Sequence, residues 1–208
     1  MNEKTCKRMS KNEQEEKESS KNHKKGRKPK GTPESRKKEL LEAVDENCNP
    51  ISILTREEIH KKNYFHKTVH IFIFNKKGEV YLQRKSLSVE EDPGKWTSSA
   101  SGHVLAGESF LIAAQRELKE ELSIKVKLEK VLRINPTEVP SPQCITLFVG
   151  HTSKIPKPNP REVAEGKYFS IEEVDKLIQT NPDMFSSTFR FLWNRYWNLV
   201  AQKELKER

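Results

Sequence analysis

The stretch GHVLAGESFLIAAQRELKEELSI, residues 102–124, limits most strongly what this chain can fold into. Glu117, Glu120 and Glu121 stand three and four residues apart, so a helix places all three carboxylates on one face. Such carboxylates repel one another, and a hard divalent cation relieves the repulsion because Mg2+ prefers oxygen ligands and shares them with phosphates. A solvated acidic face is the simpler alternative, and the three residues alone leave it open.

The residues before the acidic triplet favour the metal interpretation. Gly102 and Gly107 bracket a tight loop, and Glu108 follows it. Apolar residues then recur with helical spacing at Phe110, Leu111, Ala114 and Leu118. This pattern predicts a helix with a core-facing stripe beside its acidic face.

In this register the stretch resembles the Nudix box, G-x5-E-x7-R-E-U-x-E-E-x-G-U, in which U is a bulky apolar residue. The matching positions are Gly102, Glu108, Arg116, Glu117, Leu118, Glu120, Glu121 and Ile124. Ser123 stands where the box has its last glycine, which favours a helix end with positive φ. The substitution therefore questions the local geometry more than the chemistry.

The resemblance implies an α/β fold, a Nudix-type α/β/α sandwich with a mixed sheet, over about residues 40–200. It also implies a hydrolase that uses Mg2+ or Mn2+ to cleave the pyrophosphate bond of a nucleoside diphosphate-X type substrate. By the motif match, the metal ligands are Gly102, Glu117, Glu120 and Glu121, and the catalytic residues include Arg116, Glu117 and Glu120. Glu162 is a further catalytic candidate, because many members of the family keep their base outside the box. Arg116 orients a box carboxylate, and Glu117 or Glu162 serves as the base.

Three of the candidate residues lie outside the box. Glu162 follows a proline-rich loop at residues 155–160, and a surface carboxylate is its equally simple interpretation. Arg84 and Lys85 are adjacent cations after a predicted hairpin, where they could bind substrate phosphates or merely end a solvated strand.

The rest of the chain alternates between strand and helix patterns. Strands are expected over residues 40–49, 66–74, 79–83, 96–101, 126–133, 144–151 and 166–169. Helices are expected over residues 55–62, 170–179 and 185–200. Thr55 and Glu58 predict a capping box for the first of these helices, and the aromatic stripe of the last one is typical of a core.

The flanks of the box also resemble isopentenyl-diphosphate isomerase, a fold relative. This second resemblance rests on His66 with the following IFIFN, on Gln83-Arg84, on PGKWT at 93–97, and on Gly102-His103. The isomerase carries a cysteine before its Gly-His pair, and Ser101 stands there in this chain. Its later pair of glutamates corresponds to Ser141 and Gln143, which lack carboxylates. The isomerase and a catalytically silent Nudix binding module are therefore the alternatives to the hydrolase.

The histidines in these flanks, His66, His70 and His103, are candidates for accessory metal or phosphate contacts. A packed or surface histidine is the more ordinary role of such a residue in a strand.

The charge of the chain is concentrated at its start. The net charge is +9, and residues 1–38 hold 14 Lys and Arg against 6 Asp and Glu. Residues 1–38 are therefore expected to be a disordered basic tail, residues 39–202 the Nudix domain, and residues 203–208 a charged end. The cluster at residues 24–30 suggests nuclear import or weak nucleic-acid contact, with a solubilising tail as the plain alternative.

Cysteine usage and hydropathy suggest the surroundings of the protein. Cys6, Cys48 and Cys144 are scattered outside any metal-binding spacing, which favours a reducing compartment. No apolar run reaches the roughly 20 residues of a membrane span. We therefore expect a cytoplasmic protein with a small-molecule diphosphate as partner, no membrane contact, and a homodimer as an option.

Overall fold

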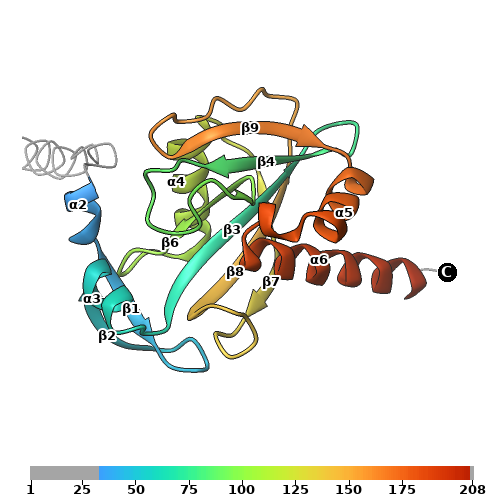
Figure 1. The fold of residues 1–208 in the computed structure, drawn as a ribbon. Helices are drawn as coiled ribbons and strands as arrows, with labels where there is room; N and C mark the ends of the chain where they lie inside the picture. The colour runs from blue at the N-terminus through green and yellow to red at the C-terminus, as the bar shows by residue number, and fades with distance from the viewer. Residues whose placement is uncertain (1–32, 207–208) are drawn as a thin grey trace, which may run out of the picture. The chain divides into compact units, whose positions relative to one another are not determined.

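The computed structural model describes residues 33–206, in which nine strands form one mixed β-sheet (Figure 1). The strands are β1 (Leu40–Val44), β2 (Pro50–Thr55), β3 (His66–Phe74), β4 (Val80–Lys85), β5 (Trp96–Thr97), β6 (Ala100–His103), β7 (Leu128–Ile134), β8 (Gln143–His151) and β9 (Val163–Phe169). The helices are α2 (Pro33–Lys37), α3 (Arg56–Lys61), α4 (Phe110–Leu122), α5 (Ile171–Thr180) and α6 (Ser187–Lys206), with a short 3-10 turn at Pro182–Met184.

Strand β3 is the centre of the sheet. One edge of β3 pairs in parallel with β8 along its whole length. The other edge pairs antiparallel with β6 over Thr68–Ile71 and then with β4 at Ile73–Phe74. The two partners on this edge therefore diverge, and β6 delivers the chain to the acidic helix α4.

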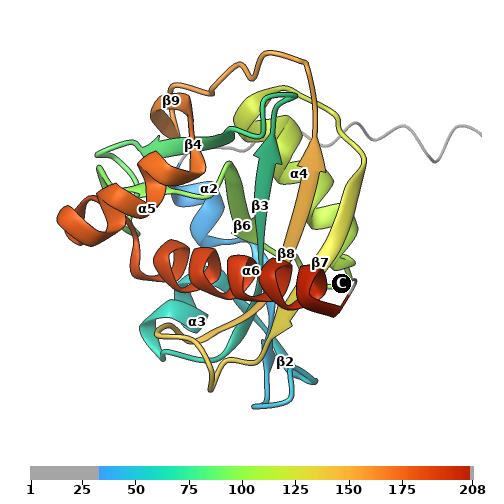
Figure 2. The ribbon, with the colours of Figure 1, turned by 90° about the vertical axis from the view of Figure 1, so that its right-hand side faces the viewer.

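Alternate residues of β3 face opposite layers, as a pleated strand requires. Ile71 and Ile73 pack into the core cluster that contains Ala114 and Leu118 of α4. Phe72 and Phe74 face the other way and join the cluster of α6. Figure 2 shows α6 in front of the central strands and α4 behind them. The predicted α/β/α sandwich with a mixed sheet is confirmed.

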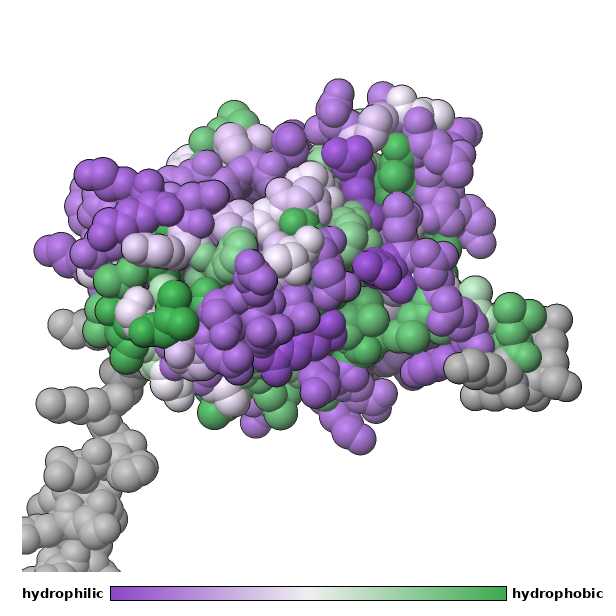
Figure 3. Space-filling model, turned by 90° about the horizontal axis from the view of Figure 1, so that it is seen from below, coloured by the Kyte–Doolittle hydropathy of each residue, from purple (hydrophilic) through white to green (hydrophobic). Residues whose placement is uncertain are grey.

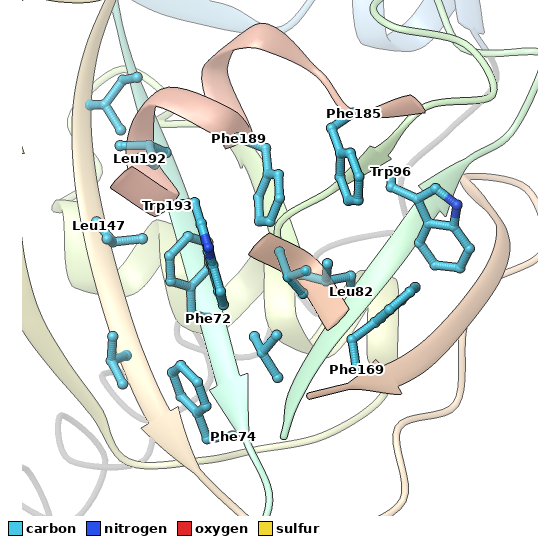
Figure 4. Close-up of a cluster of buried hydrophobic side chains, with 14 of the residues drawn as sticks. Phe72, Phe74, Leu82, Trp96, Leu147, Phe169, Phe185, Phe189, Leu192 and Trp193 are labelled. Atoms are coloured by element: carbon cyan, nitrogen blue, oxygen red, sulfur yellow. The ribbon is translucent and has the colours of Figure 1, made fainter. Parts of the chain in front are cut away.

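The aromatic stripe of α6 belongs to the core, as its spacing predicted. Phe189, Leu192 and Trp193 are almost completely buried. Phe189 and Trp193 pack against Phe72, and Trp96 lies further along the same cluster beside Phe169 (Figure 4). Leu82, in the middle of β4, belongs to the same cluster.

The helix ends follow the predicted chemistry. Both halves of the Thr55–Glu58 capping box are formed at the start of α3. Ser109 and Ser170 cap α4 and α5 through hydrogen bonds to backbone N–H groups. At the end of α4, Ser123 adopts the left-handed conformation with φ of 55°. The helix therefore ends as the box requires, although Ser123 accepts a conformation that costs a residue with a β-carbon roughly 1–2 kcal/mol.

Some boundaries differ from the sequence prediction. Strand β2 was not expected; it shows no buried alternation, because Ile51 and Ile53 are 61% and 60% exposed at the edge of the sheet. Leu111 is 43% exposed, so the stripe of α4 runs instead through Ala113, Ala114 and Leu118. Helix α2 forms within the stretch expected to be unfolded, and the basic cluster at residues 24–30 lies outside the described residues.

Cys48 and Cys144 form a disulfide that the sequence did not predict. The bond joins the turn after β1 to the first residues of β8, two segments 96 residues apart in the chain. Scattered spacing gave no sign of this pairing, since the contact depends on the tertiary fold.

The surface of the described part is mostly hydrophilic, with hydrophobic residues gathered in small areas (Figure 3). Of the helices in residues 33–206, none combines the length and the apolar character needed to cross a membrane.

Candidate active site and histidine cluster

The acidic face of α4 is turned into the molecule. Glu117 and Glu121 are 1% and 5% exposed, although both side chains are carboxylates. Glu120 lies nearer the surface, with its side chain 23% exposed. A solvated acidic face is therefore the wrong interpretation for Glu117 and Glu121, because buried carboxylates need specific partners.

Arg116 is the principal partner of this face. Its Nε and Nη2 donate to Oε1 and Oε2 of Glu108 at 2.9 and 2.8 Å. Its Nη1 donates to Glu117 Oε1 at 2.5 Å and lies 3.6 Å from Glu120 Oε2. Its Nη2 also donates to the His103 carbonyl oxygen at 2.8 Å. One planar guanidinium thus fixes the box loop, the strand β6 and two of the three carboxylates.

The pKa of Arg116 is shifted by these contacts. Burial alone lowers the pKa of the guanidinium, but the hydrogen bonds to Glu108 and the charge of Glu117 outweigh it and raise the pKa above its usual range. Arg116 is therefore permanently charged within the site.

Glu121 is held from the sheet side. Gln83 of β4 donates from Nε2 to Glu121 Oε2 at 3.0 Å, and the backbone N–H of Ser101 donates to the same oxygen at 3.1 Å. Gly102 lies against the carboxylate of Glu117 so closely that a β-carbon there would overlap it. The predicted ligands Gly102, Glu117 and Glu121 are therefore brought together.

Gln83 is a site residue that the sequence prediction missed. Its side chain is 2% exposed, and its Oε1 has no hydrogen-bond partner within residues 33–206. An unpaired buried amide oxygen beside a carboxylate indicates an absent partner, such as a cation or a water molecule. The alternation of side chains along the strand could have identified Gln83, because it shares a strand face with Tyr81, which packs into the core cluster of α4.

The adjacent cations of β4 separate onto opposite faces. Lys85 is two residues from Gln83 and so lies on the strand face of the acidic helix. Arg84 lies on the other face and pairs with Glu165 of β9, with Nη2 and Oε2 3.1 Å apart. The two cations therefore do not act as one unit, and Lys85 is the one on the side of the site.

Glu162 lies just before β9 and is 7% exposed. The loop before it reaches the acidic helix, because the Asn159 N–H donates to the Glu121 carbonyl oxygen at 2.8 Å. Glu162 Oε1 is 2.7 Å from Nη2 of Arg36 in α2. A simple surface carboxylate is thus the wrong interpretation of Glu162, and Arg36 is a second residue that the sequence prediction missed.

A histidine cluster lies next to the acidic site. Possible ligand atoms of His60, His66 and His103 all lie within 4.8 Å of one another. The Nε2 atoms of His60 and His103 are 2.9 Å apart, and His66 Nδ1 is 3.0 Å from the Tyr64 carbonyl oxygen. With Nδ1 of His66 directed at a carbonyl, its Nε2 is the acceptor nitrogen, and this atom has no hydrogen-bond partner in the described part of the chain.

The electrostatics of the cluster favour neutral rings. Burial lowers the pKa of His60 and outweighs the nearby charge of Glu91, and burial likewise lowers the pKa of His66. Neutral imidazoles are the form that binds a metal ion. His60 Nδ1 lies 3.2 Å from Glu91 Oε1, an outer contact of the kind that orients metal-binding histidines.

The cluster differs from the predicted histidine set. His70 does not belong to it; His70 Nδ1 is 2.9 Å from Ser98 Oγ. His60 of helix α3 takes the place of His70 in the cluster. No residue spacing in the sequence indicated that His60 would lie near His66 and His103. Gln143 pairs with His66 in the parallel register of β3 and β8, and its buried Oε1 has no hydrogen-bond partner among residues 33–206.

Comparison with known proteins adds three findings. A family model described as NUDIX domain matches residues 64–191. An isopentenyl-diphosphate Delta-isomerase 2 of Photorhabdus laumondii is 32% identical over 161 residues, which span 75% of this chain and 91% of the isomerase. An uncharacterised Nudix hydrolase of Pseudomonas aeruginosa is 40% identical over 87 residues, 42% of this chain and 52% of that protein.

The fold also has a close counterpart among solved structures. A crystal structure of a Deinococcus radiodurans protein superposes with a TM-score of 0.67, covering 77% of this chain and 99% of that one. The sequences are only 19% identical, so this likeness concerns the fold alone.

Proposed function

Since the chain belongs to the NUDIX domain family, we propose that it is a hydrolase that cleaves the diphosphate link of a nucleoside diphosphate-X type substrate. The observation that carries this proposal is the buried acidic face of α4. Glu117 and Glu121 are almost completely buried, and Arg116, Gln83 and the β6 backbone hold them. Arg116 is one cation against three clustered carboxylates, and a bound divalent cation would offset the remaining like charge, which speaks against a silent binding module.

The residues fit a hard divalent cation. The donor set is all oxygen, and the unpaired Gln83 Oε1 next to Glu121 indicates a missing electropositive partner. Mg2+ or Mn2+ would be held by Glu117, Glu120, Glu121 and the Gly102 carbonyl. When bound, the ion would neutralise charge on the diphosphate oxygens and lower the pKa of a bound water.

The chain itself supplies positioning and proton transfer. Arg116 keeps Glu117 and Glu120 in place through its fork of contacts. Glu117 or Glu162 accepts the proton of the attacking water as its oxygen bonds to phosphorus and the bridging P–O bond breaks. Lys85, on the strand face of Gln83, offsets the charge that develops on the phosphate oxygens.

The test is a substrate panel assayed with the full-length protein. Nucleoside diphosphate derivatives, dinucleoside polyphosphates and isopentenyl diphosphate are incubated with Mg2+, with Mn2+ and with EDTA. We expect release of two phosphate-bearing products from at least one nucleotide, and loss of that activity in EDTA. Turnover of none of the nucleotides, with conversion of isopentenyl diphosphate instead, would reverse the assignment.

A second candidate function is the isomerisation of isopentenyl diphosphate. The histidine cluster and the isomerase relative favour it, because His66, Gly102 and His103 belong to the resemblance stated for that enzyme. Ser101 opposes it, since a hydroxyl is a far weaker acid than the thiol it replaces. Detection of dimethylallyl diphosphate above a no-enzyme control would support the isomerase, and the panel above includes this assay.

The proposal keeps the remaining expectations about the protein's surroundings. They are a cytoplasmic location with nuclear import as a variant, weak nucleic-acid contact through residues 24–30, and a homodimer. The Cys48–Cys144 disulfide runs against the reducing compartment on which the cytoplasmic expectation rested, because disulfides are rare there. Nucleic-acid contact through the basic cluster should weaken steeply with salt.

A further inference from the structure

Residues 36–42 precede the stretch that the family model matches, and they run along the loop between β6 and α4, residues 104–109. The Ala106 N–H donates to the Leu40 carbonyl oxygen at 2.8 Å, and Leu41 forms a bridge with Leu105. The Gly107 N–H donates to Glu42 Oε1 at 3.1 Å. One end of this segment is therefore fixed to the loop that leads into the acidic helix.

The other end of the segment reaches the opposite wall of the site. The Glu39 N–H donates to the Arg36 carbonyl oxygen at 3.0 Å, which turns the chain into α2. Arg36 Nη2 then meets Glu162 Oε1 at 2.7 Å. Because the loop of Glu162 is itself bonded to α4 through Asn159, α2 lies between the box loop and the start of β9. Figure 1 shows α2 on the side of α4 and β6.

Arg36 has unused binding capacity at this position. Its side chain is 22% exposed, although its Nε is buried and has no hydrogen-bond partner within the described ranges. A guanidinium offers five N–H groups in a planar fork, and here Glu162 anchors it through Nη2. Such an anchored fork can bind a phosphate with its remaining donors.

A second cation, Lys85, belongs to the strand that pairs with the start of β9. Lys85 pairs with Val163 across β4 and β9, and the Ser86 N–H donates to the Glu162 carbonyl oxygen at 2.9 Å. The backbone around Lys85 is therefore bonded to the backbone around Glu162, while Arg36 contacts the Glu162 side chain. Two cations beside a cluster of carboxylates suit a ligand that carries both phosphate and a divalent metal.

We propose that Arg36, from helix α2, binds a phosphate of the diphosphate substrate, with Glu162 as its anchor. This inference rests on the proposed function for the identity of the substrate, but it concerns a residue outside the stretch that the family model matches. The N-terminal segment thus contributes to substrate binding.

The test measures binding of methylenediphosphonate, a diphosphate analogue without a hydrolysable bridge, to the full chain by calorimetry in Mg2+. In Arg36→Ala the Kd should rise about 10- to 100-fold, the effect of losing one charge-assisted hydrogen-bonding group. Arg36→Lys keeps the charge without the fork and should fall between Arg36→Ala and the parent. Lys37→Ala is the matched control; its side chain is 45% exposed one residue away, and its Kd should stay within about twofold of the parent value.

Kinetics on the substrate found in the panel provide a second readout. Arg36→Ala should raise KM more than it lowers kcat, whereas a purely structural role would lower the folded fraction and leave KM unchanged. Unchanged analogue binding in both Arg36 variants, or a parent that does not bind the analogue, would overturn the inference. Tighter binding or faster turnover in Arg36→Ala would overturn it as well, since α2 would then be a plug over the site.

The outcomes also separate this inference from the proposed function. Analogue binding that depends on Arg36 without any metal-dependent hydrolysis would retain Arg36 as a phosphate ligand and reject the hydrolase. Metal-dependent hydrolysis, together with analogue binding that does not depend on Arg36, would retain the hydrolase and reject Arg36 as a phosphate ligand.

Discussion

Gly102 leaves the space that the carboxylate of Glu117 occupies. The three atoms nearest to a β-carbon built on Gly102 all belong to Glu117, and they are its carboxylate carbon and both oxygens. Strand β6 and helix α4 can therefore approach so closely only because residue 102 lacks a side chain. The first glycine of the box is a steric requirement of the acidic site.

Gly102→Ala should consequently displace Glu117 and lower kcat about a hundredfold or more, which is the scale for losing a group that stabilises the transition state. The measurement is steady-state hydrolysis together with thermal melting. Gly78→Ala is the control, because Gly78 has open space around it and only a positive φ of 78°. That variant should lose roughly 1–2 kcal/mol of stability and keep its activity. A fully active Gly102→Ala protein would contradict the role assigned to this contact.

The layers of the fold were predictable where a pattern is local. Strand β3 alternates between two cores, and α6 carries a continuous aromatic stripe, so both could be read from periodicity. Strand β2 could not be predicted from periodicity, because Ile51 and Ile53 are exposed. Its place in the sheet depends on pairing with β1.

The site was likewise predictable only where its residues are close in the sequence. The box residues follow one another from β6 through one loop and along α4, so their spacing carries their geometry. His60, Gln83 and Arg36 come from α3, β4 and α2, and only the tertiary fold brings them towards the site. Strand β4 was expected to end at Gln83. It continues through Lys85, so the side chains of Arg84 and Lys85 lie on opposite faces of the strand.

Arg116→Lys should lower kcat about 10- to 100-fold, the usual effect of removing an outer partner of a metal ligand. Lysine keeps the charge but cannot reproduce the two bonds to Glu108 together with those to Glu117 and the His103 carbonyl. Arg195→Lys is the control, since Arg195 is 51% exposed in a pair with Glu138. Full activity in Arg116→Lys would show that Arg116 contributes only its charge.

His70 should make stability depend on acidity. Burial, followed by the charge of Lys85, lowers the pKa of His70 from 6.5 to about 3. The unfolded chain therefore binds a proton below pH 6.5 that the folded chain excludes, and stability is lost as the pH falls from 6.5 towards 3. The contribution of one such group is about 1.4 kcal/mol per pH unit.

Urea unfolding at several pH values checks this dependence. His70→Gln should show a shallower loss of stability between pH 6.5 and 5 than the parent, whereas His151→Gln, at an exposed position, should follow the parent. The comparison of slopes isolates His70 from the other buried histidines. Parallel slopes in parent and His70→Gln would contradict the prediction.

The Cys48–Cys144 disulfide should stabilise the fold measurably. Its cysteines are 96 residues apart, and bonds that close such loops typically contribute about 2–4 kcal/mol. Dithiothreitol should therefore lower the Tm of the parent and leave that of Cys48→Ala unchanged. Free thiols at both positions in mass spectra of the unreduced protein would show that the bond does not form.

Glu121→Gln tests whether the acidic helix binds metal. The change removes a proposed ligand and should lower Mg2+-dependent kcat about 10²- to 10³-fold. Glutamine keeps one acceptor oxygen for Gln83 or the Ser101 N–H, so the Tm without metal should stay within a few degrees of the parent. Glu129→Gln, at an exposed position of β7, is the charge-matched control and should change neither quantity. A large loss of metal-free stability with activity retained would instead identify Glu121 as a structural carboxylate.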